Sequence, residues 1–169
     1  MKGDMFSWMD SNEPDLDCSE ILPQSLFLGG YEVANDASLL SKLGISHVVQ
    51  LGNASEIADL YRVDSDKFVI HRILVEDSVR DHMTPALLDF ALNFIAESLC
   101  SGGRVLVHCR AGVSRSSSVV IAFLVRERGM GVKEARIFVK QRRPCICPNS
   151  TFQKDLVDYA KVVQDKRSN

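Results

Sequence analysis

Residues 104–125, RVLVHCRAGVSRSSSVVIAFLV, hold the pattern from which the fold and chemistry of this chain can be inferred. An apolar run that ends at His108 predicts a buried strand, and a second run from about Ser116 predicts a helix. Residues 109–115 form a tight loop between them. Because the first amides of a helix have no intrahelical partner and the helix dipole is positive there, this strand–loop–helix is suited to bind phosphate.

The loop contains the residue types that an anion site needs. Several inward-pointing amides would form a nest, and Gly112 lets the backbone turn without a Cβ in the way. Arg115 closes the loop, and its planar guanidinium can hold two oxygens of a phosphoryl group. The predicted phosphate-binding residues are Arg110, Ala111, Gly112, Val113, Ser114 and Arg115.

Cys109 would lie at the base of this nest. The field that attracts phosphate also favours the thiolate, the form in which cysteine is a nucleophile. The Ser116 hydroxyl would lie beside the sulfur and could donate a hydrogen bond to it, and His108 is expected to be a buried neutral imidazole that orients the loop. The alternative is that Cys109 is only a small buried hydrophobe and Arg115 only a surface charge. This alternative requires that the His, Cys, Gly, Arg and Ser residues of the segment 108–116 occur at these offsets by chance.

The rest of the chain alternates apolar and amphipathic stretches and predicts a single α/β domain. We expect a central, mixed but mostly parallel sheet of about five strands flanked by helices, with the phosphate loop between a strand end and a helix N-terminus. Thr84 and Pro85 are a strong helix start signal. Strands are predicted over residues 25–28, 47–51, 68–74 and 104–107, and helices over 36–43, 85–100, 116–128, 132–143 and 150–163.

Length and composition bound the class of protein. The 169 residues are 46% hydrophobic and 25% charged, which excludes a disordered chain, a collagen-like repeat and a disulfide-dense miniprotein. The apolar runs are shorter than a membrane span, and the first ten residues lack the apolar centre of a secretory signal. We divide the chain into an acidic arm (1–18), one catalytic domain (19–163) and a short tail (164–169).

The formal net charge of −2 is unevenly distributed. Acids outnumber the single base Lys2 in the first twenty residues, whereas bases cluster over residues 126–143. That cluster lacks the interleaved aromatic platforms of a nucleic-acid surface, so neither a nucleic acid nor a membrane is expected as a partner. It is either a solvated helix face or a docking surface for an acidic substrate.

The five cysteines are an odd number and include no CxxC pair. Neither a disulfide framework nor a zinc site is expected, and a reducing compartment, the cytoplasm and also the nucleus, is predicted. Cys145 and Cys147 are expected to be buried thiols. The alternative is that one of them forms a reversible disulfide with oxidised Cys109.

The segment HCRAGVSRS (108–116) resembles the HCxxGxxRS signature of the cysteine-dependent protein phosphatases, specifically the small dual-specificity group. Three further segments resemble that group, so that the likeness covers about residues 19–160. The long insertions of the classical tyrosine-specific branch are not seen, and Cys109 lies too late for the low-molecular-weight branch. The three segments are EILPQSLFLGG (20–30), LLSKLGISHVVQL (39–51) and RRPCICPNSTF (142–152).

The resemblance implies hydrolysis of phosphotyrosine and of phosphoserine or phosphothreonine in proteins through a cysteinyl-phosphate intermediate. Cys109 would attack phosphorus while Arg115 and the loop amides hold the equatorial charge. No metal or organic cofactor is expected, because preorganised donors supply what a metal would. The implied partner is a phosphoprotein, with a protein kinase among the candidates, and the protein is expected to be a monomer or a weak dimer.

A leaving alkoxide or phenoxide needs a proton, and residues 75–82 (VEDSVRDH) hold the candidate acids Glu76, Asp77 and Asp81. The resemblance favours Asp77, from its spacing to the helix cap and to Cys109, with Asp81 as the alternate. Alternatively, these acids only solvate the loop, or Asp81 supports the helix N-terminus.

Asn149 is the remaining candidate. The resemblance suggests that its amide helps to hold the phosphate loop, and the alternative is a helix N-cap shared with Ser150.

Two other functions stay open. One is a phosphate-binding scaffold with weak or no catalysis, which the joint presence of Cys109, Arg115 and Asp77 disfavours. The other is a phosphatase for a non-protein phosphate, a phosphoinositide or an RNA end. Relatives directed at phosphoinositides add bases inside the loop, and here Arg110 is the only extra one, which favours a phosphoprotein.

Overall fold

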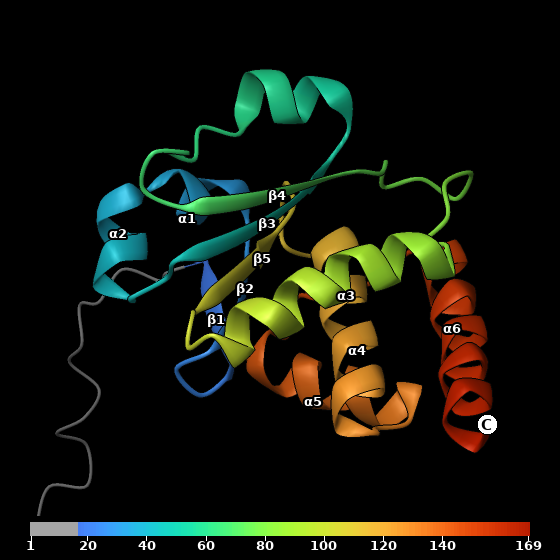
Figure 1. Ribbon diagram of the computed structural model, residues 1–169. Helices are drawn as coiled ribbons and strands as arrows, with labels where there is room; N and C mark the ends of the chain where they lie inside the picture. The colour runs from blue at the N-terminus through green and yellow to red at the C-terminus, as the bar shows by residue number, and fades with distance from the viewer. Residues whose placement is uncertain (1–16) are drawn as a thin grey trace, which may run out of the picture.

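A five-stranded sheet with the order β1-β2-β5-β3-β4 lies at the centre of the computed structural model, which describes residues 17–169 (Figure 1). β1 pairs with β2 in antiparallel fashion, and the other neighbours are parallel. The predicted α/β class and the mixed, mostly parallel sheet are confirmed. The strands are β1 (Cys18–Leu22), β2 (Leu26–Gly29), β3 (His47–Gly52), β4 (Val69–Leu74) and β5 (Val105–His108).

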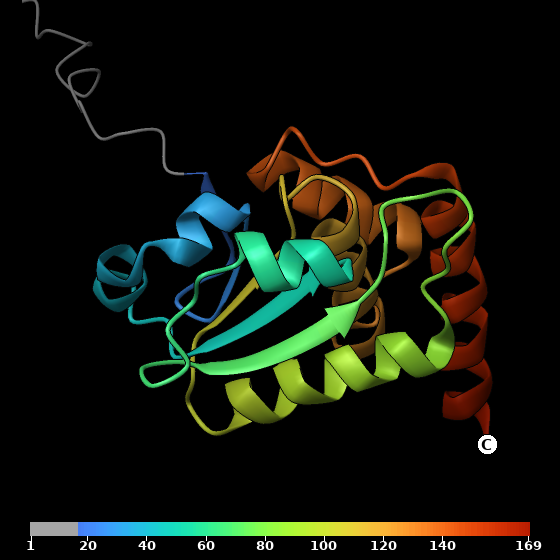
Figure 2. The same cartoon turned by 90° about the horizontal axis from the view of Figure 1, so that it is seen from above.

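Helices cover both faces of the sheet (Figures 1 and 2). On one face, α1 (Tyr31–Asn35) and α2 (Ala37–Lys42) pack over Leu106 of β5, and on the other the larger helices pack over Val105 and Val107. Alternate residues of β5 therefore face two apolar layers, as expected for a buried parallel strand. The larger helices are α3 (Pro85–Cys100), α4 (Arg115–Arg128), α5 (Val132–Arg142) and α6 (Ser150–Ser168).

α4 is the most buried helix. Every residue from Arg115 to Val125 is buried, and the helix lies against α3, α5 and α6. The helix that follows the phosphate loop is thus also the centre of the core.

The expected helix boundaries are mostly confirmed by their caps. The Thr84 hydroxyl accepts a hydrogen bond from the Leu87 amide at 3.2 Å, and Pro85 follows as the first helical residue. Gly129 ends α4 in the left-handed conformation at φ 66°, which glycine adopts without steric cost. Within residues 17–169, no helix combines the length and apolar character needed to cross a bilayer.

Some elements differ from the sequence-based prediction. The short helix α1 and a π-helical turn η1 (Glu56–Leu60) were not predicted, because segments of five residues show too little periodicity. Residues 164–168, predicted as a tail, continue α6. The side chains of Lys166 and Arg167 bond Asp89 of α3 and a carbonyl of α4, which holds this last turn in place. Of the predicted arm 1–18, residues 1–16 lie outside the described part, and Cys18 already belongs to β1.

Candidate active site

The loop between β5 and α4 holds Cys109 at the carboxyl end of a central parallel strand, where open α/β sheets bind ligands. Cys109 is buried, with 2% of its surface exposed. Its Sγ accepts a hydrogen bond from the Gly112 amide at 3.3 Å and lies 3.1 Å from Ser116 Oγ. The sulfur therefore lies at the N-terminal end of α4, in contact with one main-chain amide and one hydroxyl.

The carbonyl groups of this loop all bond to partners outside the nest. The Arg110 carbonyl accepts from the Tyr31 amide at 3.1 Å, and the Val113 carbonyl accepts from the Cys147 amide at 2.8 Å. The carbonyls of the two residues between, Ala111 and Gly112, accept from the guanidinium of Arg143 at 3.1 and 2.8 Å.

A trans peptide directs its C=O and the following N–H in opposite directions. With four successive carbonyls held outward, the amides of residues 111–114 point to the other side and form the nest expected from the sequence. The contact of the Gly112 amide with the sulfur shows this direction. The arrangement can hold the equatorial oxygens of a phosphoryl group above the Cys109 sulfur.

Gly112 is required at its place in the loop. Its φ is +65°, and a Cβ there would lie 2.6 Å from the Gly29 carbonyl oxygen and 2.7 Å from a nitrogen of Arg143. Both the backbone conformation and the close approach of β2 exclude a side chain here.

Arg115 is buried and bound to an acid that the sequence analysis did not identify. Its Nη1 and Nη2 donate to the two oxygens of Glu56 at 2.5 and 3.0 Å, and Nη1 also lies 3.3 Å from the Val75 carbonyl. This hydrogen bond lowers the pKa of the Glu56 carboxyl, so the pair is ionic. Arg115 Nε is buried without a protein partner among the described residues, and it is therefore a donor available to an anion.

Glu56 is fixed by its own turn. The Asn53 and Glu56 side chains each accept a hydrogen bond from the other residue's backbone amide at 2.9 Å. This reciprocal pattern is that of a capping box, and the motif N-x-x-E was the only sequence signal that could have identified Glu56.

Asp77 is exposed in the loop before α3, and its Oδ1 accepts a hydrogen bond from the Asn149 amide at 3.0 Å. The main-chain N–H of Asn149 donates to Ser114 Oγ at 3.0 Å. The candidate acid loop and the phosphate loop are therefore joined through one residue.

The role predicted for the Asn149 side chain needs correction. Its amide does not reach the backbone of the phosphate loop, since its nitrogen contacts Asp77 and the Ser78 carbonyl while its oxygen caps α6 at the Phe152 amide, 2.9 Å away. The alternative, an N-cap, is what the structure shows, and contact with the loop is made by the main chain.

Asp81 has a position different from that of Asp77. Its Oδ2 accepts the Glu76 amide at 2.6 Å, which braces the turn that presents Asp77. It does not cap α3, because Thr84 does so. One oxygen of Asp81 is thus committed to the loop's own structure.

His108 is fully buried beneath the loop, with Nδ1 3.1 Å from the Cys109 carbonyl oxygen. Because a carbonyl only accepts, the geometry assigns the proton to Nδ1. Burial lowers the pKa of His108 from 6.5 to about 4, so the ring is neutral near pH 7. The His108 and Tyr61 rings pack in a T-shaped arrangement with 4.7 Å between their centroids.

Cys145 and Cys147 are exposed, contrary to the expectation that both are buried thiols. They follow the Pro144 turn at the surface, and only Ile146 between them enters the core. The Cys147 main chain, not its thiol, braces the phosphate loop.

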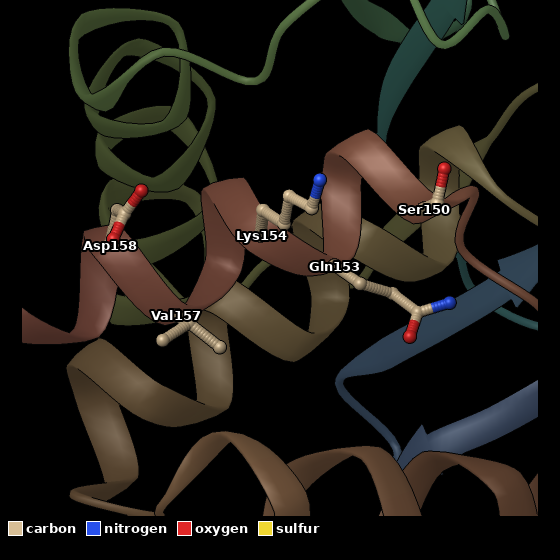
Figure 3. Close-up of a pocket in the computed structure, with 5 residues that line it drawn as sticks. All are labelled: Ser150, Gln153, Lys154, Val157 and Asp158. Atoms are coloured by element: carbon tan, nitrogen blue, oxygen red, sulfur yellow. The ribbon is translucent and has the colours of Figure 1, made fainter.

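The pocket whose lining residues are drawn in Figure 3 lies outside the phosphate loop. It has a volume of about 560 Å³ and is lined by residues of α6 alone, so it is a surface feature of one helix and contains none of the predicted site residues. Among residues 17–169, no group of three or more His, Cys, Asp or Glu side chains is arranged to hold a metal ion. The lining residues are Ser150, Gln153, Lys154, Val157 and Asp158.

Comparison with known proteins identifies the class to which this fold and loop belong. The family described as dual specificity phosphatase, catalytic domain, matches residues 26–162. This chain belongs to that family, as the resemblance of the segment 108–116 implied.

Individual relatives agree with this assignment. The chain is 38% identical over 145 residues to a probable rhodanese domain-containing dual specificity protein phosphatase of Dictyostelium discoideum, covering 83% of this chain and 28% of that protein. It is 36% identical to dual specificity protein phosphatase 1B of Arabidopsis thaliana, covering 95% of each. The chain spans less than a third of several curated relatives that it matches.

A solved structure shows the same fold. The crystal structure of the human tyrosine phosphatase-like serine/threonine/tyrosine-interacting protein superimposes with a TM-score of 0.83 at 32% identity, covering 88% of this chain and 99% of that one.

Glu56→Gln should reduce activity because Glu56 binds both terminal nitrogens of Arg115. The amide keeps the shape but removes the charge that fixes the Arg115 guanidinium, so kcat on p-nitrophenyl phosphate should fall by about 10- to 100-fold. The free energy of unfolding should fall by about 1–3 kcal/mol. Glu127→Gln, which disrupts an ion pair with Arg126 on the surface, is the matched control and should change neither. Unchanged kcat in Glu56→Gln would remove Glu56 from this role.

His108 should make the fold sensitive to mild acid. The pKa of His108 is lower in the folded than in the unfolded chain, so the unfolded state binds more protons between pH 6.5 and 4 and stability falls as the pH falls through that window. The free energy of unfolding should drop by about 2 kcal/mol more between pH 7.5 and pH 5 in the wild type than in His108→Asn. Urea titrations at both pH values measure this, and equal drops would contradict it.

Proposed function

We propose that this protein hydrolyses phosphotyrosine and phosphoserine or phosphothreonine in proteins through a cysteinyl-phosphate intermediate. The observation that carries the proposal is the loop 109–115, in which the carbonyls of residues 110–113 are held outward and the Gly112 amide donates to the Cys109 sulfur. Membership of the dual specificity phosphatase family supports the same chemistry.

In the first step, the Cys109 thiolate attacks phosphorus in line with the leaving oxygen. The S–P bond forms, the P–O ester bond breaks, and protonated Asp77 gives its proton to the leaving oxygen. The amides of the loop and Arg115 hold the three equatorial oxygens throughout.

In the second step, a water molecule attacks the phosphorus of the intermediate and Asp77, now a carboxylate, takes its proton. The S–P bond breaks and inorganic phosphate leaves. The hydroxyl of Ser116, 3.1 Å from the sulfur, stabilises the returning thiolate.

The surroundings of the loop support a phosphoprotein substrate. Arg110 and Ala111 are exposed beside the nest, and Arg110 is the only extra base in the loop, fewer than expected for a phosphoinositide. Within the predicted basic stretch 126–143, Arg128, Lys133 and Arg136 are exposed and keep open a docking surface for an acidic substrate, whereas three other arginines have partners or are buried. Arg126 bonds Asn93, Arg142 lies over the Phe138 ring and Arg143 is buried.

Cellular setting and assembly are also part of the proposal. The five cysteines are free thiols, which supports a reducing compartment, and we place the protein in the cytoplasm and also the nucleus. We expect a monomer or a weak dimer that meets its phosphoprotein, a protein kinase among the candidates, as a substrate.

A second candidate is a phosphate-binding protein without turnover. It is favoured by the structural likeness to a protein described as tyrosine phosphatase-like and interacting. The retained Cys109, Arg115 and Asp77 favour the enzyme.

Cys109→Ser should abolish turnover and keep binding. Phosphate release from p-nitrophenyl phosphate should fall to background, because an alcohol at this position is not ionised near neutral pH. Binding of a phosphopeptide, measured by calorimetry, should persist. If the wild type binds the peptide but releases no phosphate, the second candidate is correct.

Asp77→Asn should separate two substrate classes. The side-chain oxygen released from a phosphopeptide is a poor leaving group and needs the proton, so kcat on this substrate should fall by about 100-fold or more. An activated aryl phosphate hardly needs protonation and should lose less than 10-fold. Asp81→Asn is the matched comparison, since one oxygen of that side chain holds the loop. Equal losses on both substrates in Asp77→Asn would exclude Asp77 as the acid.

A further inference from the structure

Arg143 contacts the phosphate loop from the side opposite to the nest. It follows the last residue of α5 and is 4% exposed. Nε donates to the Gly112 carbonyl at 2.8 Å, and Nη2 donates to the Ala111 carbonyl at 3.1 Å. A buried cation therefore holds two consecutive carbonyls of the loop.

The remaining contacts of this guanidinium are made with residues near the start of the described chain. Nη2 also donates to Asp17 Oδ1, and Nη1 lies 3.4 Å from Ser19 Oγ. Asp17 is the ion-pair partner of Arg143, and its side chain is 46% exposed. The Asp17 carbonyl accepts the Gly30 amide at 3.4 Å, next to Tyr31, which bonds the loop carbonyl of Arg110.

These contacts make Arg143 different in kind from Arg115. Its guanidinium is engaged by two carbonyls, a carboxylate and a hydroxyl, and it is buried behind the backbone. It acts on a bound anion only through the peptide groups of Ala111 and Gly112. A cation on a carbonyl fixes the direction of the peptide plane and polarises it, so that the next amide is a better donor.

We propose that Arg143 and Asp17 are a positioning pair for the oxyanion site. Arg143 turns the Gly112 and Val113 amides toward the phosphoryl oxygens and the Cys109 sulfur, and Asp17 holds Arg143 in that orientation and balances its buried charge. The pair deepens the proposed phosphatase function and rests on it. It makes the affinity of the site for an oxyanion dependent on a carboxylate that precedes β1.

The experiment uses the full chain and inorganic phosphate as the probe. Asp17→Asn keeps the shape but removes the charge, and Arg143→Lys keeps the charge but loses the planar fork. Phosphate dissociation constants come from calorimetry, and the pH profile of Cys109 alkylation by iodoacetamide reports ionisation of the sulfur. The matched controls are Glu20→Gln on β1 and Arg142→Lys, both exposed neighbours of the pair.

Arg143→Lys should weaken phosphate binding by about 10-fold or more and Asp17→Asn by about 3- to 10-fold, each moving the alkylation profile to higher pH. The double variant should bind no worse than Arg143→Lys alone, because the two residues act in series. Both controls should match the wild type.

Changes in melting temperature alone, with the dissociation constant and alkylation profile of the wild type, would overturn the pair. If Arg143→Lys does not fold, Asp17→Asn at the half-exposed position decides the question by the same two measurements. Tight phosphate binding by a wild type that shows no turnover would overturn the proposed function, while the dependence on Asp17 would still support or reject the pair.

Discussion

The outward orientation of four successive carbonyl groups, Arg110 to Val113, is the constraint on which the site depends. A peptide plane is rigid, so a nest of amides can exist only if the opposite edges of the same planes find partners. Here those partners come from the start of α1, from Arg143 and from the segment before α6. The loop is thus held from three directions by parts of the chain far from it in sequence.

The two buried arginines, Arg115 and Arg143, lie on opposite sides of the loop backbone and have different roles. Arg115 is aligned by Glu56 and its Nε has no partner within residues 17–169, whereas Arg143 is engaged by the carbonyls and Asp17. Both are compensated by a carboxylate, which a buried guanidinium needs. Two charge-neutral pairs, Arg115 with Glu56 and Arg143 with Asp17, are therefore placed around one anion site.

Sequence reasoning identified the parts of the site whose signal is local. The strand, loop and helix of residues 104–125 follow from apolar periodicity and one glycine, and Cys109, Ser116 and Arg115 lie at short, fixed offsets within them. Glu56 and Arg143 were missed because their partners lie 59 and 31 residues away, and a single sequence carries no sign of such pairs. Cys145 and Cys147 were placed in the core because composition alone does not show which side of a turn faces water.

The burial of α4 from Arg115 to Val125 has a practical consequence for handling this protein. The helix that supplies the anion site is also the one around which α3, α5 and α6 assemble, so the site cannot persist in a partly melted chain. The site and the core should therefore unfold together. The activity that remains after heating would then measure the fraction of molecules that are still folded.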